Sequence, residues 1–335
     1  MRDVYILAIE SSCDETSMAI VKNGKDVIGL SIATQIDTHA RYGGVVPEIA
    51  SRMHTEVVTL VLDDVLSKAN MKIDDVDAIA VTYAPGLTGS LIVGIEAAKT
   101  LSLIYDKPLI AVNHLIGHIY ANNIESDLEF PMLALVVSGG HTELLIMESD
   151  YKFKRLGETL DDAIGEAYDK VARVIGLGYP GGPKIDKVAK EGNPDAIAFK
   201  RVFLEKGSLD FSFSGLKTAV LNYLNTERQA GREISVPDVA ASFQAAVVDV
   251  IVAKTMEAVK ERKQDKLVLA GGVAANSKLR QDLQKACDDA GVSLYIPQPI
   301  LCTDNAAMIA CAAYYKYKAF GACDLYMDAD PSMAI

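Results

Sequence analysis

The chain has 335 residues, half of them apolar, no Trp, and a formal net charge of -12 at pH 7. One hydrophobic core usually stops growing below this length, so we expect two domains. The negative charge excludes a protein whose whole surface coats nucleic acid, because phosphate binding depends on Lys and Arg. The opening apolar run, residues 4–9, lacks the h-region of a signal peptide, and charges break every apolar segment before the roughly 18 residues that span a bilayer. The five Cys form no CxxC pair, which indicates a reducing, cytoplasmic location and no membrane.

The first half of the chain predicts a hairpin followed by alternating strands and helices. The hairpin covers residues 7–20, LAIESSCDETSMAI, in which two apolar runs flank a tight polar turn. A strand, a Gly-rich loop, a helix and another strand follow, at 76–84, 85–90, 91–104 and 107–112.

The second half repeats this order. Residues 133–146, LALVVSGGHTELLI, match the first hairpin at an offset of 126 positions, with Leu133 over Leu7 and Thr142 over Thr16. A strand, a Gly-rich loop, a helix and a strand then recur at 266–270, 271–276, 277–290 and 292–297. Two matching blocks in the same order indicate a duplicated α/β domain. We place the domain boundary near residue 130, which gives domains 1–130 and 131–335.

The motif NHLIGH places His114 and His118 four residues apart at the start of a predicted helix, where such side chains share one face. The equivalent helix start in the second half carries Asp304. If the two helix starts face each other across a cleft between the halves, two imidazoles and one carboxylate meet there. This ligand set suits Zn²⁺ or non-haem Fe²⁺ better than Mg²⁺. The alternative is a pair of helix histidines, one that caps and one that packs.

Two Gly-rich turns, 138–141 (SGGH) and 270–276 (AGGVAAN), follow predicted strands. Glycine allows a backbone to approach an anion and direct N–H groups at it, although such turns also serve as hairpin turns or helix entries. Between them, Thr159 is predicted to cap a helix, and Asp186 to begin a further turn of helix after a rigid YPGGP turn. Asp169 and Asp186 are candidates to accept hydrogen bonds from ribose hydroxyls.

These motifs together resemble the TsaD family of tRNA threonylcarbamoyladenosine transferases, formerly labelled O-sialoglycoprotein endopeptidases. The resemblance rests on NHLIGH, LVVSGGHTEL, residues 157–189 and LAGGVAANSKLR, and its wording is closest to the bacterial branch. Ile116 stands where many members have Glu. The family fold is of the acetate kinase, Hsp70 and actin type, with two duplicated ribonuclease-H-like halves around a nucleotide- and metal-binding cleft, which agrees with the internal repeat.

The resemblance implies transfer of a threonylcarbamoyl group from threonylcarbamoyl-adenylate to N6 of the adenosine beside the tRNA anticodon, with release of AMP. By motif, His114, His118 and Asp304 bind one Fe²⁺ or Zn²⁺ per chain. The residues expected to hold the adenylate are Val137, Ser138, Gly139, Gly140, His141, Asp169, Gly182, Asp186 and Asn276. Asp14 and Glu15, on the turn that corresponds to SGGH, are candidates for the carboxylate that takes the amine proton; the alternative is an ordinary hairpin turn.

The resemblance also implies partners, a TsaB-like paralogue and a TsaE-like ATPase, and tRNA as substrate. The helix predicted at 46–69 is unusually rich in apolar residues and is our candidate for the partner face. Basic clusters occur at 152–155, 200–206 and 260–266.

Three alternatives stay open at this point. A metalloprotease would carry HExxH, whereas Leu115 follows His114. A small-molecule kinase of the same fold would bind ATP at the two Gly-rich turns and Mg²⁺ loosely. A non-enzymatic nucleotide-binding subunit would be expected to lack the two histidines and the aspartate.

Overall fold

A computed structural model of the protein describes residues 2–333 and 335. The chain forms two compact units. Unit 1 comprises Met1–Phe130, Ser149–Lys152 and Pro297–Ile335, and unit 2 comprises Pro131–Glu148 and Phe153–Ile296.

Unit 1 is built on a five-stranded sheet with the order β3-β2-β1-β4-β5. Its first three strands are antiparallel, and β4 and β5 run parallel to β1. The strands are β1 (Tyr5–Glu10), β2 (Glu15–Lys22), β3 (Asp26–Thr34), β4 (Ala78–Ala84) and β5 (Leu109–Asn113). The helices are α1 (Ile36–Ala40), α2 (Pro47–Ala69), η1 (Ile73–Asp75), α3 (Thr88–Tyr105), α4 (His114–Glu125), α10 (Pro299–Cys302) and α11 (Ala306–Phe320).

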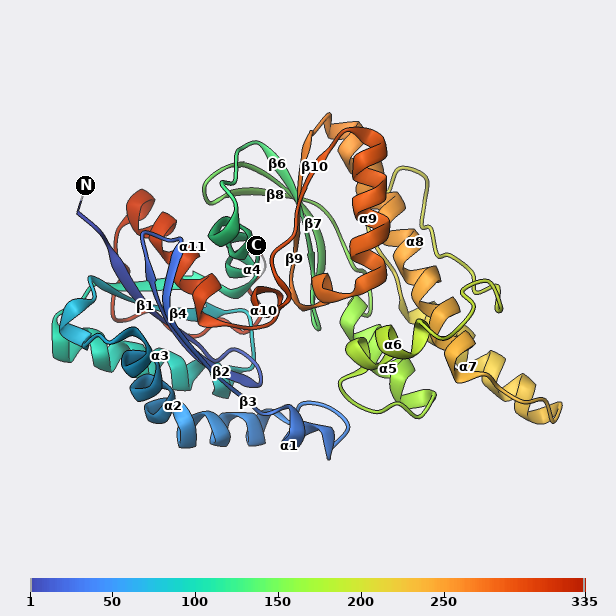
Figure 1. The fold of residues 1–335 in the computed structure, drawn as a ribbon, viewed down its shortest axis with the longest axis horizontal. Helices are drawn as coiled ribbons and strands as arrows, with labels where there is room; N and C mark the ends of the chain where they lie inside the picture. The colour runs from blue at the N-terminus through green and yellow to red at the C-terminus, as the bar shows by residue number, and fades with distance from the viewer. Residues whose placement is uncertain (1, 334) are drawn as a thin grey trace. The chain divides into compact units, whose positions relative to one another are not determined.

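Helices cover both faces of this sheet, with α2 and α3 on one face and α11 on the other (Figure 1). Successive strand residues point to opposite faces, so a strand covered on both faces is apolar along its whole length. β1 follows this pattern: Leu7 and Ile9 join a buried cluster with Leu91 of α3 and Val61 of α2. The apolar run of β1 ends at Glu10, a carboxylate with no exposed surface.

Unit 2 repeats the same topology. Its sheet has the order β10-β9-β6-β7-β8, in which β6 pairs antiparallel with β7 and parallel with β9, and β9 pairs parallel with β10. The strands are β6 (Met132–Val137), β7 (Thr142–Ser149), β8 (Lys152–Glu158), β9 (Lys266–Ala270) and β10 (Ser293–Tyr295). The helices are α5 (Ile164–Val174), α6 (Gly181–Ala189), α7 (Ser214–Gln229), α8 (Val236–Arg262), η2 (Gly272–Ala275) and α9 (Ser277–Ala290).

The long helix α8 is the core helix of unit 2. It has the length and composition of a membrane span, but 67% of its most apolar window is buried inside the protein. Its neighbours are α6, α7 and α9. Burial against other helices accounts for its apolar character.

The shared strand order confirms the duplicated α/β fold predicted from the repeat at Leu7 and Leu133. The structure groups 297–335 with unit 1, whereas the predicted division assigned this segment to the second domain; division of the chain near residue 130 stays a prediction. The physical reason for the grouping is that α11 packs against α4 and across the sheet of unit 1.

Two local predictions are wrong. Thr159 does not cap α5, which begins at Ile164; the Thr159 hydroxyl donates to the carbonyl of Asp162 instead. The N–H of Ile164 donates to the hydroxyl of Thr142, which is distant in sequence. Asp186 lies within α6 rather than at its start, because that helix already begins at Gly181.

Candidate functional site

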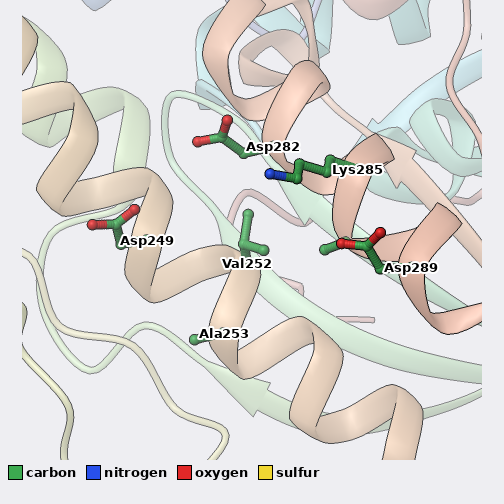
Figure 2. Close-up of a pocket in the computed structure, with 7 residues that line it drawn as sticks. Asp249, Val252, Ala253, Asp282, Lys285 and Asp289 are labelled. Atoms are coloured by element: carbon green, nitrogen blue, oxygen red, sulfur yellow. The ribbon is translucent and has the colours of Figure 1, made fainter.

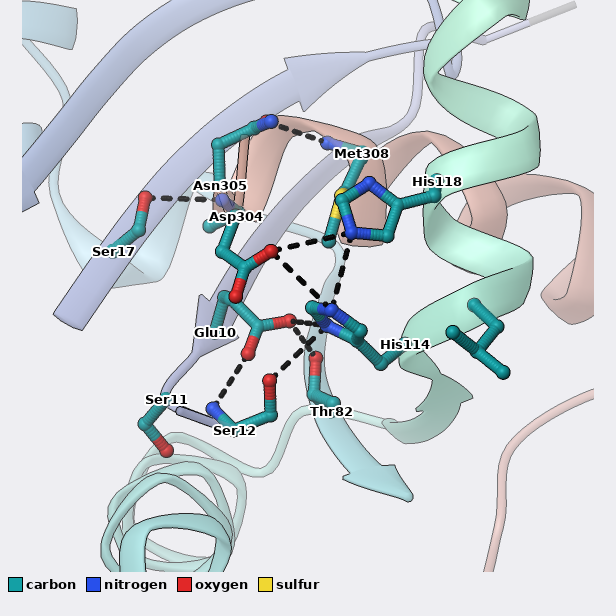
Figure 3. A network of polar contacts seen from close by, with 12 residues as sticks. Glu10, Ser11, Ser12, Ser17, Thr82, His114, His118, Asp304, Asn305 and Met308 are labelled. Carbon is teal, nitrogen blue, oxygen red and sulfur yellow. Dashed lines mark hydrogen bonds and ion pairs between the residues drawn. The ribbon is translucent and has the colours of Figure 1, made fainter. Parts of the chain in front are cut away.

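His114, His118 and Asp304 converge at the N-terminal ends of two helices of unit 1 (Figure 3). The Asn113 side chain accepts hydrogen bonds from two N–H groups in the first turn of α4, so the helix begins at His114 and carries His118 one turn later. Asn305 caps α11 in the same way by accepting from the N–H of Met308. Asp304 immediately precedes that cap.

All three residues belong to unit 1, so Asp304 is not contributed by the second half as expected. The predicted meeting of two histidines and one aspartate is nevertheless present. Asp304 reaches the histidines because α11 and α4 pack against each other within the unit. The repeat therefore pointed to the residue that meets the two histidines, and the structure groups that residue with unit 1.

The spacing of the three ligand atoms fits a divalent transition metal. The Nε2 atoms of His114 and His118 lie 3.1 Å apart, and they lie 3.4 and 3.2 Å from Oδ1 of Asp304. With metal–ligand bonds of about 2.1 Å, ligand atoms are about 3.0 Å apart along an octahedral edge and about 3.4 Å apart in a tetrahedron. The observed separations fall in this interval, and the nitrogen and oxygen donors match the ligand preferences of such metals.

The ionisable groups of this cluster shift one another's pKa values. Burial opposes a charge on His114, but Asp304 and Glu10 hold the pKa of His114 well above its usual range. Burial and the neighbouring charge of His114 lower the pKa of His118. Although burial opposes ionisation, the two histidines hold the pKa of Asp304 well below its usual range, and His114 lowers that of Glu10. A metal that binds here displaces a proton from His114.

The turn after β1 brings Glu15 into the electrostatic reach of Asp304, with Asp14 beside it. Asp14 is buried, and Glu15 begins β2 and accepts a hydrogen bond from the Thr34 hydroxyl. Burial, with repulsion from Asp304 and Asp14, raises the pKa of Glu15 to about 9. Glu15 therefore holds a proton at neutral pH in the metal-free protein.

The residues predicted to hold the adenylate lie together in unit 2, around the turn after β6 and the starts of α5, α6 and α9. Asp169 accepts from the first N–H of α6 at Gly181, at 2.6 Å. Asp186 accepts from both the backbone N–H and the hydroxyl of Ser277, at the start of α9. Asn276 caps α9 and donates to Gln244.

The glycines of this region are of two kinds. Gly271 has a φ of 94°, and a Cβ there would lie 2.3 Å from the carbonyl oxygen of Val137, so only glycine fits. Gly139, Gly140 and Gly182 have no atom within 4 Å of the position of a Cβ, so each presents bare backbone to open space. Such surfaces accommodate a ligand that approaches the main chain closely.

A cavity of about 400 Å³ lies elsewhere in unit 2, between α8 and α9 (Figure 2). It is lined by Asp249, Val252, Ala253, Asp282, Lys285, Ala286 and Asp289. None of the predicted site residues lines it. Asp249 pairs with Arg201 and Asp282 with Lys278, so two of its carboxylates already have partners. We place neither predicted site there.

Sequence reasoning missed Glu10 and Ser12, which contact His114, and Thr82, which donates to Glu10. The carboxylate of Glu10 and the hydroxyl of Ser12 lie 2.9 and 3.1 Å from Nδ1 of His114. The available signal was the acid at the end of the apolar run YILAIE, since a charge that closes a buried strand needs a partner.

Comparison with known proteins identifies the sequence relatives. A family described as tRNA N6-adenosine threonylcarbamoyltransferase (TsaD) matches residues 26–311. The chain is 52% identical over 334 residues to the protein of that name from Staphylococcus carnosus strain TM300, covering 100% of this chain and 97% of that one. It is 56% identical over 333 residues to the protein of the same name from Clostridium botulinum strain Kyoto, covering 99% and 98%.

Solved structures of lower identity share the fold. Full-length HypF in its phosphate- and nucleotide-bound form aligns with a TM-score of 0.63 at 15% identity, over 94% of this chain and 46% of HypF, so this chain spans about half of that protein. The activator of 2-hydroxyisocaproyl-CoA dehydratase from Clostridium difficile, with bound ADPNP, aligns with a TM-score of 0.53 at 15% identity, over 95% and 96%. These likenesses support the predicted fold class.

The first prediction concerns metal content. We expect about one transition-metal ion per chain, and its loss when His114 and His118 are both changed to Ala, because one remaining protein ligand cannot hold it. Elemental analysis of purified protein measures this. His39→Gln is the control, since His39 is a buried histidine that bonds Gln35 and the N–H of Val46. Equal metal in the double variant would contradict the site.

The second prediction concerns the pH dependence of stability in metal-free protein. Because the pKa of Glu15 is raised from 4.5 to about 9 in the folded state, the native protein retains a proton that the unfolded chain has lost. The corresponding stability is complete below about pH 4.5 and is lost as pH rises through 9. Glu15→Gln should therefore flatten the fall in unfolding free energy between pH 5 and 9, measured with urea. Exposed Glu56→Gln is the control, and parallel profiles for wild type and Glu15→Gln would refute the prediction.

Proposed function

Since the chain belongs to the tRNA N6-adenosine threonylcarbamoyltransferase family, we propose that it transfers the threonylcarbamoyl group of threonylcarbamoyl-adenylate to N6 of the adenosine beside the tRNA anticodon. The observation that carries this proposal is the convergence of His114, His118 and Asp304 within one unit. The chain that holds them is 56% identical to one of these transferases.

The reaction forms a bond between N6 and the carbamoyl carbon and breaks the bond from that carbon to the adenylate phosphate oxygen. AMP leaves with the bonding electron pair, and N6 loses one proton. The nucleophile is weak because its lone pair is delocalised into the purine ring. The reaction therefore needs an activated carbonyl, an acceptor for the proton and close positioning of the two substrates.

His114, His118 and Asp304 would hold Zn²⁺ or Fe²⁺. When bound, such an ion supplies Lewis acidity that offsets negative charge on the carbonyl and on the leaving phosphate. The same three residues do not fit a metalloprotease, because Leu115 occupies the place of the glutamate base and is fully buried. A kinase that holds Mg²⁺ loosely would not need two histidine ligands, because Mg²⁺ prefers oxygen ligands and keeps several waters.

Asp14 is the better candidate for the proton acceptor. In the metal-free protein, burial and the charges of Asp304 and Asp14 raise the pKa of Glu15 to about 9, and burial, the largest of these causes, persists when a metal is bound. Asp14 lies on the same turn. Of the two candidates named from the sequence, we therefore propose Asp14 as the proton acceptor.

The proposed adenylate site comprises Val137 to His141, Asp169, Gly182, Asp186 and Asn276. The supporting observation is the combination of open glycine backbone with carboxylates at the starts of two helices. Asp186 and Asn276 also bond the start of α9, so their loss would disturb the unit as well as any ligand. Glycine variants therefore test the site more cleanly.

The partners we propose are tRNA, a TsaB-like paralogue and a TsaE-like ATPase. A chain of net charge -12 gains RNA affinity from partners that add cationic surface. The face we propose for the paralogue is the outer surface of α2 and α3, where large apolar side chains are exposed: Leu60, Ile92, Leu103 and Ile104. Apolar side chains gathered on two packed helices are typical of a protein interface.

The third prediction tests the reaction and its base. Reconstitution with tRNA, threonylcarbamoyl-adenylate and both partners should give the modified nucleoside, detected by nucleoside analysis. Under single-turnover conditions, Asp14→Asn should slow transfer by about two to four orders of magnitude, the usual contribution of general-base catalysis. Glu15→Gln should slow it far less, because an amide resembles a protonated carboxyl. Absence of product with wild type would reject the function, and equal rates for Asp14→Asn and wild type would reject the base.

The fourth prediction tests the adenylate site. Gly182→Ala should weaken binding of a non-hydrolysable adenylate analogue by at least about tenfold, because the added methyl occupies space that the ligand needs, whereas the fold has room for it. Gly215→Ala on α7 is the matched control, since that glycine is equally open. Calorimetry measures both affinities. Unchanged binding in Gly182→Ala would remove this glycine from the site.

The fifth prediction tests the partner face. Leu60→Asp combined with Leu103→Asp should abolish co-elution with the TsaB-like paralogue, because two charges would be buried in an apolar interface. Leu160→Asp in unit 2, at an equally exposed leucine, is the control. Co-elution that survives the double change would exclude α2 and α3 as the interface.

A further inference from the structure

Glu10 ends β1 directly beneath the His–His–Asp cluster and has no exposed surface. Its Oε1 accepts from the N–H of Ser12 at 2.6 Å, and its Oε2 accepts from the hydroxyl of Thr82 at 2.6 Å. Oε2 also lies 2.9 Å from Nδ1 of His114 (Figure 3). We propose that Glu10 is a positioning residue that fixes which nitrogen of His114 is free to bind a metal, an inference that rests on the proposed metal site.

The direction of the hydrogen bond follows from the partners of the carboxylate. An ionised carboxylate can only accept, and Glu10 is surrounded by donors. Nδ1 of His114 therefore carries the proton and donates it to Oε2. In a neutral imidazole the other nitrogen then holds a lone pair. That nitrogen, Nε2, is the atom that faces His118 and Asp304.

His118 provides an internal contrast. Its Nδ1 is buried and has no hydrogen-bond partner among the described residues, so no side chain there selects its tautomer. The cluster thus has one histidine whose Nδ1 is bonded to a carboxylate and one whose Nδ1 has no such partner among the described residues. Glu10 should set the tautomer of His114 alone, because it bonds no nitrogen of His118.

An amide at position 10 would reverse this arrangement. The N–H of Ser12 requires an acceptor, so the oxygen of a glutamine would turn towards Ser12 and its NH₂ group towards His114. Nδ1 would then become the acceptor, and the proton would move to Nε2, where it blocks metal binding. The opposite orientation of the amide would set two donors, the amide NH₂ and the N–H of Ser12, against each other.

The test measures zinc affinity of metal-free protein by competition with a chromophoric chelator, without tRNA or adenylate. Glu10→Gln should weaken zinc binding about 10- to 100-fold, the usual effect of losing the group that orients a ligating histidine. Thr82→Val is the matched control, because it removes a bond to the same buried carboxylate without touching His114, and its loss should be smaller. Unchanged affinity in Glu10→Gln, or an equal loss in Thr82→Val, would overturn the proposal.

A second measurement uses the wild-type protein and does not depend on the folding of a variant. In zinc-loaded protein with ¹⁵N-labelled histidine, long-range proton–nitrogen spectra should show a proton bonded to Nδ1 of His114. A proton-free Nδ1, or wild-type protein that binds no zinc, would contradict the assignment. A protein that passes both tests but does not modify tRNA would overturn the proposed function alone.

Discussion

The packing of α11 against α4 is the contact on which the candidate metal site depends. The two histidines share a face of α4 because they are four residues apart, but a carboxylate reaches that face only because the start of α11 lies against it. Gly117 of α4 makes this close approach possible, since a Cβ there would lie 2.6 Å from Cδ1 of Ile309 in α11. A glycine between the two histidines therefore leaves room for the side chains of the helix that follows Asp304.

Helix caps then define the positions of the ligand side chains on these two packed helices. Asn113 and Asn305 satisfy N–H groups in the first turns of their helices, so His114 and Asp304 sit beside fixed helix ends. The N-terminal end of a helix carries a partial positive charge, which favours an ionised Asp304 at that position. The capping residues Asn113 and Asn305 thus specify where α4 and α11 begin. They also place His114 and Asp304 next to those starts.

The sequence predicted the elements whose signals are local, and missed the contacts between distant residues. The hairpins, the repeated strand order and the spacing of His114 and His118 could be read from periodicity, and the repeat directed attention to Asp304. Thr159 has the chemistry of a helix cap, but Thr142 of β7 takes that role because the fold brings it to Ile164. Glu10 was missed for the same reason: its partner His114 is 104 positions away. The glycines predicted the turns at 138–141 and 270–276, but the sequence did not show which of these glycines face open space.

The buried carboxylates around His114 favour a bound cation for a reason that does not depend on the spacing of the ligand atoms. The charge of Asp304 acts on the ionisation of Glu10, and the charges of Asp304 and Asp14 act on that of Glu15. His114, which bonds Glu10 and Asp304, has a pKa raised enough to carry a compensating charge. Burial of several carboxylates with one imidazolium is costly, and the raised pKa of Glu15 is the result. A divalent ion at His114, His118 and Asp304 would replace one displaced proton by two positive charges, so it would relieve the repulsion that the fold has built into the turn after β1.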